Sequence, residues 1–361
     1  MRYLLNRDNT LIVRGPASVQ LLTGKAMVLG SPFDTSRKLI VRRERQLPIE
    51  TSSKADLDIA LGEKGSIFEL EGSTIPNSWK SAVQVLREMK YGRIVIIGAA
   101  DAGKSTLTAF LTNSLIAMGL KPLIIDADIG QADIGPPTTI ARAAPSDYIS
   151  SLVDLSPESM LFIGHTSPSQ VEGKLIDGIS RLASCPQQCL IIINTDGWIT
   201  DSEAMLYKIR MIRTIEPNLV LGITAGTELE AILSSAGAES FKVESPETVL
   251  ARTRLDRRQL RRAGYKRFLD GGSVRNFSRS SVTLKLPRGL PSISGNLGHE
   301  LGNLIVGLND KAGYLLQIGV LLSIHGNLLR AYSRTVEGLA EVELGCVKLS
   351  IDGMELGYLE L

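Results

Sequence analysis

A glycine-rich segment with a fixed pattern constrains this 361-residue chain more than any other feature. Residues 98–106 read GAADAGKST and fit G-x-x-x-x-G-K-[ST]. An apolar β-like run precedes the segment at 93–97, and apolar periodicity predicts a helix over about 104–118. Backbone N–H groups and the positive end of a helix would then face an anion. The pattern predicts a phosphate-binding loop, with a plain turn that joins strand to helix as the alternative.

The residue types of this loop match the chemistry of a bound nucleotide. Gly98 and Gly103 let the backbone bend around a phosphate without a Cβ clash. Lys104 can reach the β and γ phosphates, and Ser105 offers a hydroxyl to Mg²⁺. The expected nucleotide contacts are Gly98, Ala99, Ala100, Asp101, Ala102, Gly103, Lys104, Ser105 and Thr106. The motif indicates a nucleotide and a metal, but it does not identify a reaction.

Sequence texture divides the chain into three parts. Short β-like runs between Gly, Pro and Asp fill 1–85 and predict a small β domain. Apolar runs alternate with helical stretches over 86–272, which predicts a parallel sheet covered on both faces. The Gly-punctuated β texture returns over 273–361. We therefore predict an α/β fold, with a central P-loop domain flanked by small β-rich N- and C-terminal domains. The strands expected in the central domain are 93–97, 122–126, 160–163, 189–193 and 219–223.

Composition excludes several classes of protein. Hydrophobic residues make up 43%, so a large core can be buried and disorder is excluded for the whole chain. The formal net charge is only +2, which by itself says nothing about nucleic acid. Three cysteines exclude a disulfide framework and show no zinc spacing. No signal peptide and no apolar run of about 20 residues is found, so we expect a cytoplasmic protein without a membrane partner.

Two carboxylates follow the strand expected at 122–126. Asp126 and Asp128 stand two residues apart in DADIGQ, at the strand end that lies beside the phosphate loop in a parallel sheet. One can bind Mg²⁺ through water, and the other can accept a proton from an attacking hydroxyl. A polar strand terminus is the alternative. The spacing does not assign the two roles.

Two further loops end at the same edge of the predicted sheet. GHTSP at 164–168 can line a substrate channel or simply cap the helix near 170–183. NTDGW at 194–198 places Trp198 after a glycine, where it could stack on a base. From the residues alone, packing of Trp198 against a neighbouring helix is the favoured interpretation.

A strongly basic stretch lies at 252–267, where eight of sixteen residues are Lys or Arg. A thin apolar stripe predicts a helix near 250–268, with Gly264 as a weak point. Such a run is usually a solvated face. Beside a phosphate loop, its arginines could instead stabilise a transferring phosphoryl group or hold a nucleic-acid backbone.

Taken together, these motifs resemble the polynucleotide 5′-hydroxyl kinase family. DADIGQ resembles its D-x-D-x-G-Q motif and NTDGW its N-T-x-G-W segment, both more specific than a phosphate loop. GHTSP resembles its G-x-x-S/T-P turn, and RRQLRR at 257–262 resembles its arginine-bearing lid. The flanking parts resemble the family's terminal domains, so the resemblance covers nearly the whole chain. The short length favours the stand-alone archaeal type over a subunit of the messenger-RNA cleavage and tRNA-splicing machinery.

The resemblance implies transfer of the ATP γ-phosphate to the 5′-hydroxyl end of RNA, or of DNA, with Mg²⁺ or another divalent cation. Asp126 is the first candidate to accept the hydroxyl proton and Asp128 the second, while Trp198 becomes a nucleobase clamp. The implied catalytic residues are Lys104, Asp126, Asp128, Arg258, Arg261 and Arg262. The implied substrate contacts are Gln131, His165, Thr166, Ser167, Thr195, Trp198 and Arg257. The implied metal ligands are Ser105, Asp126 and Asp128. Protein partners in RNA processing are also implied.

Two other functions compete with the kinase. One is a nucleotide-dependent switch that hydrolyses ATP or GTP on a protein partner. The segment at 194–197 is not the guanine-specifying N-K-x-D motif, which weakens a GTP switch. The other is an RNA-processing scaffold that binds ATP structurally, and the intact Lys104, Ser105 and aspartates disfavour it.

Overall fold

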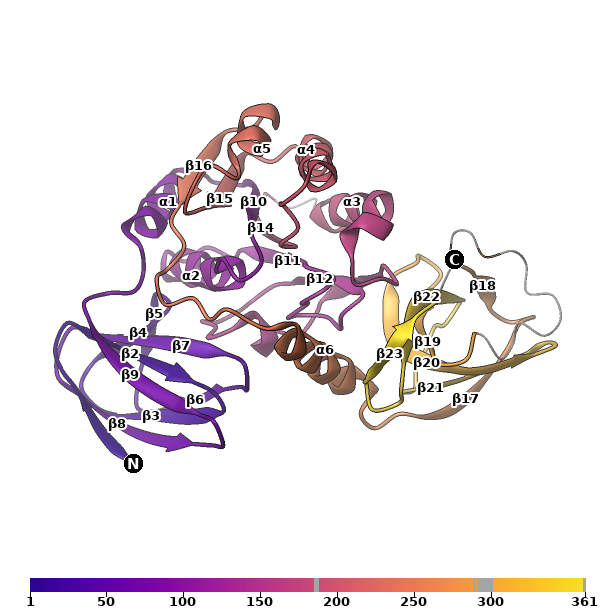
Figure 1. The fold of residues 1–361 in the computed structure, drawn as a ribbon, viewed down its shortest axis with the longest axis horizontal. Helices are drawn as coiled ribbons and strands as arrows, with labels where there is room; N and C mark the ends of the chain where they lie inside the picture. Colours follow the sequence, from indigo (N-terminus) through magenta and orange to yellow (C-terminus); the bar gives the residue numbers. More distant parts are fainter. Residues whose placement is uncertain (185–187, 288–289, 291–300, 360–361) are drawn as a thin grey trace. The chain divides into compact units, whose positions relative to one another are not determined.

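A computed structural model describes residues 1–184, 188–287, 290 and 301–359. The chain forms two compact units, each built from several stretches of sequence. The first unit comprises Met1–Ile124, Ala144–Leu155 and Cys185–Thr253; the second comprises Ile125–Ala143, Ser156–Ser184 and Arg254–Leu361. Figure 1 shows the helices and strands of both units. Among the described residues, no helix is long and apolar enough to cross a membrane.

The N-terminal part of the first unit consists of two antiparallel sheets, as the short β-like runs predicted. One sheet has the order β1-β8-β3-β6 and the other the order β5-β4-β7-β2-β9. Buried and more exposed residues alternate along β3 and β8, so that Val19, Leu57 and Ile59 point into the core. The strands are β1 (Arg2–Leu5), β2 (Asn9–Arg14), β3 (Ala17–Thr23), β4 (Ala26–Val28), β5 (Ser31–Phe33), β6 (Lys38–Val41), β7 (Gln46–Thr51), β8 (Ala55–Leu61) and β9 (Ser66–Glu71).

The rest of the first unit is a parallel sheet with helices. Strands β14 (Leu190–Thr195), β10 (Gly92–Gly98), β15 (Leu219–Ile223) and β16 (Ser240–Val243) lie side by side in that order. Ile94, Val95, Ile96 and Ile97 of β10 are completely buried, as expected for a strand covered on both faces. The helices are α1 (Asn77–Glu88), α2 (Lys104–Ala117), α4 (Ser202–Ile215) and α5 (Glu230–Ser235).

Strand β11 (Leu123–Ala127) begins in the first unit and ends in the second. In the second unit it lies next to β12 (Thr139–Ala143), which pairs antiparallel with β13 (Ser159–Phe162). The sequence predicted only parallel strands here and missed β12. The sheet is mixed because β12 and β13, the stretch expected at 160–163, run antiparallel to each other. Helix α3 (Glu172–Ala183) follows and packs against β12.

The C-terminal part of the second unit is a sheet with the order β17-β21-β20-β19-β22-β18, and β23 also pairs with β22. This sheet packs closely against β13 of the same unit. A Cβ on Gly307 would lie only 2.4 Å from Cγ of Phe162 in β13, so the glycine is needed for this approach. The strands are β17 (Ser273–Ser278), β18 (Thr283–Lys285), β19 (Leu304–Asn309), β20 (Leu315–His325), β21 (Leu328–Ser333), β22 (Glu341–Leu349) and β23 (Glu355–Tyr358).

The predicted basic helix is α6 (Arg254–Leu269), which lies in the second unit. Its face towards the unit carries the buried Tyr265 and Leu269. Gly264 does not interrupt the helix. A Cβ at Gly264 would lie 2.9 Å from Cδ of Pro137, so this glycine permits the close approach of α6 to the loop before β12.

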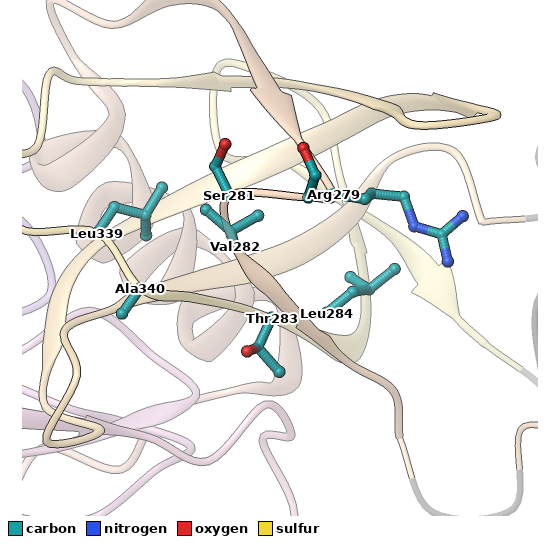
Figure 2. Close-up of a pocket in the computed structure, with 8 residues that line it drawn as sticks. Arg279, Ser281, Val282, Thr283, Leu284, Leu339 and Ala340 are labelled. Carbon is teal, nitrogen blue, oxygen red and sulfur yellow. The ribbon is translucent and has the colours of Figure 1, made fainter.

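A shallow cavity of about 480 Å³ lies in the C-terminal sheet, beside β18. Figure 2 shows Ser281, Val282 and Thr283 in succession along one side, with Leu339 and Ala340 on a neighbouring segment. None of the site residues predicted from the sequence lines this cavity.

Candidate active site

The phosphate loop connects β10 to α2 as predicted. Gly103 has φ +100°, a conformation that residues with a Cβ rarely adopt, and α2 begins at the next residue. A Cβ at Gly98 would lie 2.8 Å from the carbonyl oxygen of Ile223. The buried Lys104 ammonium donates to the carbonyl oxygens of Gly98 at 3.0 Å and Ala99 at 2.8 Å. The loop therefore curls around the end of its own lysine.

An arginine that the sequence analysis did not single out binds the phosphate loop. The main-chain N–H of Arg252 donates to Oδ2 of Asp101 at 3.1 Å, and its Nη1 donates to Oδ1 at 3.1 Å. Both side chains are mostly buried, with 20% and 13% of their surface exposed. Arg252 is the first residue of the basic stretch, but the sequence motif assigned catalytic and substrate roles only to the paired arginines at 257–262. Position in the stretch was the only sequence signal for it.

The turn after β14 packs directly on the phosphate loop. A Cβ at Gly197 would lie 2.5 Å from the backbone nitrogen of Ala100, so only glycine fits there. Nδ2 of Asn194 donates to the hydroxyl of Ser105 at 3.4 Å. The turn 194–198 and the loop 98–106, which are distant in sequence, thus form one surface of the first unit.

Trp198 is held at its edge and on one face, and the indole remains partly exposed. Its Nε1 donates to Oδ2 of Asp201 at 2.7 Å, and its ring stacks on Tyr207 with centroids 5.7 Å apart and an angle of 24°. Packing against a helix, which the residues alone favoured, is therefore present. Thr195 is buried, and its hydroxyl donates to the carbonyl of Ile96 at 2.7 Å, which joins β14 to β10. The substrate role expected of Thr195 stays a prediction.

The acidic segment lies in the second unit. Oδ2 of the buried Asp126 accepts N–H groups from Asp133 at 2.6 Å and Ile134 at 3.1 Å. Burial raises the pKa of Asp126 to about 7, with the negative charges of Asp133 and Asp128 acting in the same direction. Oδ1 of Asp128 accepts N–H groups from residues 130 and 131, at 3.1 and 2.9 Å, and so closes a turn. The two aspartates, equal in the sequence, have different environments.

The turn 164–168 lies beside this acidic segment in the second unit. A Cβ at Gly130 would lie 2.9 Å from the carbonyl oxygen of Thr166. The hydroxyls of Thr166 and Tyr358 are 2.7 Å apart, and the ring of His165 lies 5.3 Å from that of Tyr358. Burial lowers the pKa of His165. Nδ1 of His165 accepts the main-chain N–H of Ser167 at 2.9 Å, which shapes the turn.

The predicted lid arginines are engaged with the C-terminal sheet. Arg261 forms a bidentate ion pair with Glu355, at 2.6 and 2.7 Å, and Arg262 pairs with Asp352. Arg258 donates to the carbonyl of Glu355 at 3.3 Å. The carbonyl of Arg257 accepts from the Gln131 side chain at 3.5 Å, so α6 also touches the acidic segment. This geometry braces α6, and the catalytic roles expected of these arginines stay predictions.

Among the described residues, no group of three or more His, Cys, Asp or Glu side chains is arranged to hold a metal ion. The predicted ligands do fit Mg²⁺ in their chemistry, because a serine hydroxyl and aspartate carboxylates are the hard oxygen donors it prefers. Mg²⁺ also usually takes only one or two protein carboxylates and completes its shell with phosphate and water.

A phosphate loop on an interior strand of a parallel sheet, followed by a helix N-terminus, defines a P-loop nucleotide-binding protein. Residues 98–271 match the family model of the mRNA cleavage and polyadenylation factor CLP1 P-loop, and this segment belongs to that family. The resemblance read from the motifs is confirmed.

Relatives match over most of the chain. The polyribonucleotide 5′-hydroxyl-kinase of Pyrococcus abyssi is 28% identical over 340 residues, which cover 79% of this chain and 96% of that protein. The enzyme of the same name from Methanocaldococcus jannaschii is 24% identical, with coverage of 79% and 95%. The solved structure of Clp1p in complex with Pcf11p superposes with a TM-score of 0.75 at 14% identity, over 96% of this chain and 97% of that one. That likeness confirms the fold.

Proposed function

We propose that this protein is a polynucleotide 5′-hydroxyl kinase that transfers the γ-phosphate of ATP to the 5′-hydroxyl end of RNA. The observation that carries the proposal is the contact of Gly197 with Ala100. This contact places Trp198, which can stack on a nucleobase, next to the loop that binds the phosphates of the nucleotide. The names of the archaeal relatives support the same activity.

In the proposed reaction, the phosphate loop binds the triphosphate of ATP. The ammonium of Lys104 exchanges the carbonyl oxygens of Gly98 and Ala99 for phosphate oxygens. The N-terminus of α2 adds its partial positive charge. Phosphoryl transfer needs positioning and charge neutralisation more than covalent chemistry, and these groups supply both.

Mg²⁺ is part of the proposal. Ser105, with Asp126 or Asp128, would hold the ion, and bound Mg²⁺ neutralises charge on the phosphates. Asn194 donates to the hydroxyl of Ser105 at 3.4 Å and so helps to hold this side chain in place.

Asp126 is the preferred general base. Its pKa of about 7 is matched to neutral pH, where a carboxylate of raised basicity can still be ionised and accept a proton effectively. Asp128, whose Oδ1 closes the turn, is better suited to orient Gln131 and the metal's water.

The acceptor is held by stacking and by charge. The partly exposed indole of Trp198 stacks on a base near the 5′ end, which gives little sequence preference. His165, Thr166 and Ser167 line the path of the acceptor. Arginines of α6 act on the phosphoryl group only after exchanging their ion pairs with Asp352 and Glu355. DNA ends as further acceptors, protein partners in RNA processing and a cytoplasmic location belong to the same proposal.

The test is incubation of the protein with γ-labelled ATP, Mg²⁺ and a 5′-hydroxyl RNA oligonucleotide. Label should appear on the RNA, and a matched oligonucleotide with a 5′-phosphate should take none. The Lys104→Ala variant should lose transfer by a factor of 100 or more, as loss of a transition-state charge partner does. Release of labelled phosphate without labelled RNA would favour a switch enzyme, and retained, unreacted ATP would favour a scaffold.

A further inference from the structure

One lysine of the first unit is completely buried. The side chain of Lys208, in α4, has 0% of its surface exposed, and that of its partner Asp196 has 5%. The ammonium lies 2.8 Å from Oδ2 of Asp196 and donates to the carbonyl oxygen of the same residue at 3.1 Å. The sequence pattern gave no role to either residue.

The carboxylate of Asp196 is shared among three donors. Oδ2 accepts the Lys208 ammonium and the hydroxyl of Tyr207 at 2.9 Å, while Oδ1 accepts the main-chain N–H of Trp198 at 3.0 Å. Tyr207 is itself fully buried and stacks on the indole. Lys208 and Asp196 therefore hold both the backbone of Trp198 and the ring beneath it.

The same turn touches the phosphate loop. Gly197, between Asp196 and Trp198, packs on the backbone of Ala100. A displacement of Asp196 would therefore change the position of the indole relative to the bound phosphates. All these contacts lie within the first unit, and Asp196, Trp198 and Lys208 all follow β14 in the chain.

Stability alone is a poor explanation for this ion pair. Desolvation of two charges often outweighs their attraction, and apolar side chains of similar volume commonly serve as well or better in a core. A satisfied polar network does provide a single geometry, because its hydrogen bonds are directional. We therefore attribute to Asp196 and Lys208 a role in fixing the position of the turn 196–198.

We propose that Asp196 and Lys208 are positioning residues for the acceptor base: their buried ion pair fixes the turn 196–198 so that Trp198 stacks the base at the correct distance from the phosphate loop. The proposal rests on the proposed kinase function. It concerns acceptor binding and leaves ATP binding to the loop itself.

The test compares three variants: Asp196→Asn, Lys208→Met and the double variant. The side-chain oxygen of Asn at position 196 can still accept the N–H of Trp198. The double variant leaves no unpaired buried charge, so the double variant should fold even if a single variant does not. Steady-state kinetics should show an acceptor KM raised roughly tenfold in both single variants, with the KM for ATP within twofold of the unchanged protein. The double variant should recover part of the loss.

An acceptor without bases on its first two nucleotides makes the test specific. If the ion pair acts through stacking on Trp198, the variants and the unchanged protein should use this abasic acceptor equally poorly. The matched control is Lys242→Met, which removes an ion pair of the same 2.8 Å length whose side chains are half exposed, and it should change neither KM.

The outcomes separate the two proposals. Failure of the unchanged protein to label any 5′-hydroxyl RNA would overturn the kinase function and this inference with it. An active protein whose double variant and Asp196→Asn variant keep the normal acceptor KM would overturn the inference alone. An equal rise in KM on the normal and abasic acceptors would also overturn it, because the effect would not pass through the base.

Discussion

Arg252 holds Asp101 of the phosphate loop through both its backbone and its guanidinium, with donor–acceptor distances of 3.1 Å. Its Nε also donates to the carbonyl of Glu44 at 3.3 Å, so one side chain joins the loop to the N-terminal β part. Asp101 has φ +61°, a conformation that L-residues other than Asn and Asp rarely adopt. The ion pair and the loop conformation therefore support each other.

The Arg252→Ala variant should bind ATP about tenfold more weakly. The change leaves the Asp101 carboxylate beside the phosphates without its arginine, and a hydrogen-bonded ion pair of this burial is worth about 1.5–3 kcal/mol. Isothermal titration with ATP checks the prediction. The Arg252→Ala/Asp101→Asn variant should regain part of the affinity, because Asn tolerates the same backbone conformation and carries no charge. Arg7→Ala is the control, since its 3.1 Å pair with Asp8 is exposed and should matter little.

Kinase activity should rise with pH through about 7 as Asp126 loses its proton. The folded pKa is raised above the unfolded value of about 3.9, so the native state binds this proton more tightly. The associated stability is present at low pH and is lost as pH rises through about 7. Asp126→Asn should abolish transfer, because the amide cannot serve as the general base. The same variant should raise the Tm more at pH 8.5 than at pH 5, because the cost of the buried charge is largest where Asp126 is ionised. Equal Tm changes at both pH values would contradict the raised pKa.

The Trp198→Ala variant should raise the acceptor KM by roughly tenfold to a hundredfold, because base stacking is worth about 1–3 kcal/mol. ATP binding should change little, since the phosphate loop meets the turn at Gly197. Steady-state kinetics with either substrate varied measure the difference. Trp198→Phe should retain most of the affinity, and Tyr91→Ala, an exposed aromatic elsewhere in the unit, should have no effect.

The Glu355→Gln variant should loosen α6. The pair with Arg261 is bidentate and mostly buried, with exposed fractions of 16% and 7%, and breaking such a pair costs about 3–5 kcal/mol. Hydrogen exchange over 254–269 should quicken, and the Tm should fall by several degrees. Asp352→Asn makes a matched comparison on the same helix, because its pair with Arg262 is half exposed. If the amide hydrogens of α6 exchanged at the same rate in both variants, the bracing role of Glu355 would be refuted.

Local patterns in the sequence predicted much of this structure. The run at 93–97 is β10, the helix expected at 104–118 is α2, and the basic helix expected near 250–268 is α6. Strand β12 escaped prediction because its five residues, TIARA, carry a charged arginine and follow a proline-rich loop. Its antiparallel neighbour made the sheet mixed rather than parallel.

The sequence alone determined the phosphate loop, because its spacing, its glycines and the flanking strand and helix are all local properties of nine residues and their neighbours. Only the tertiary structure decided which charges act together. Asp101 and Arg252 are 151 positions apart, and Arg261 meets Glu355 across 94 positions, so no pattern of spacing could pair them. The same holds for Asp126 and Asp128, because burial is set by packing rather than by residue type. Two aspartates of one short motif therefore differ in environment, and burial raises the pKa of Asp126 to about 7.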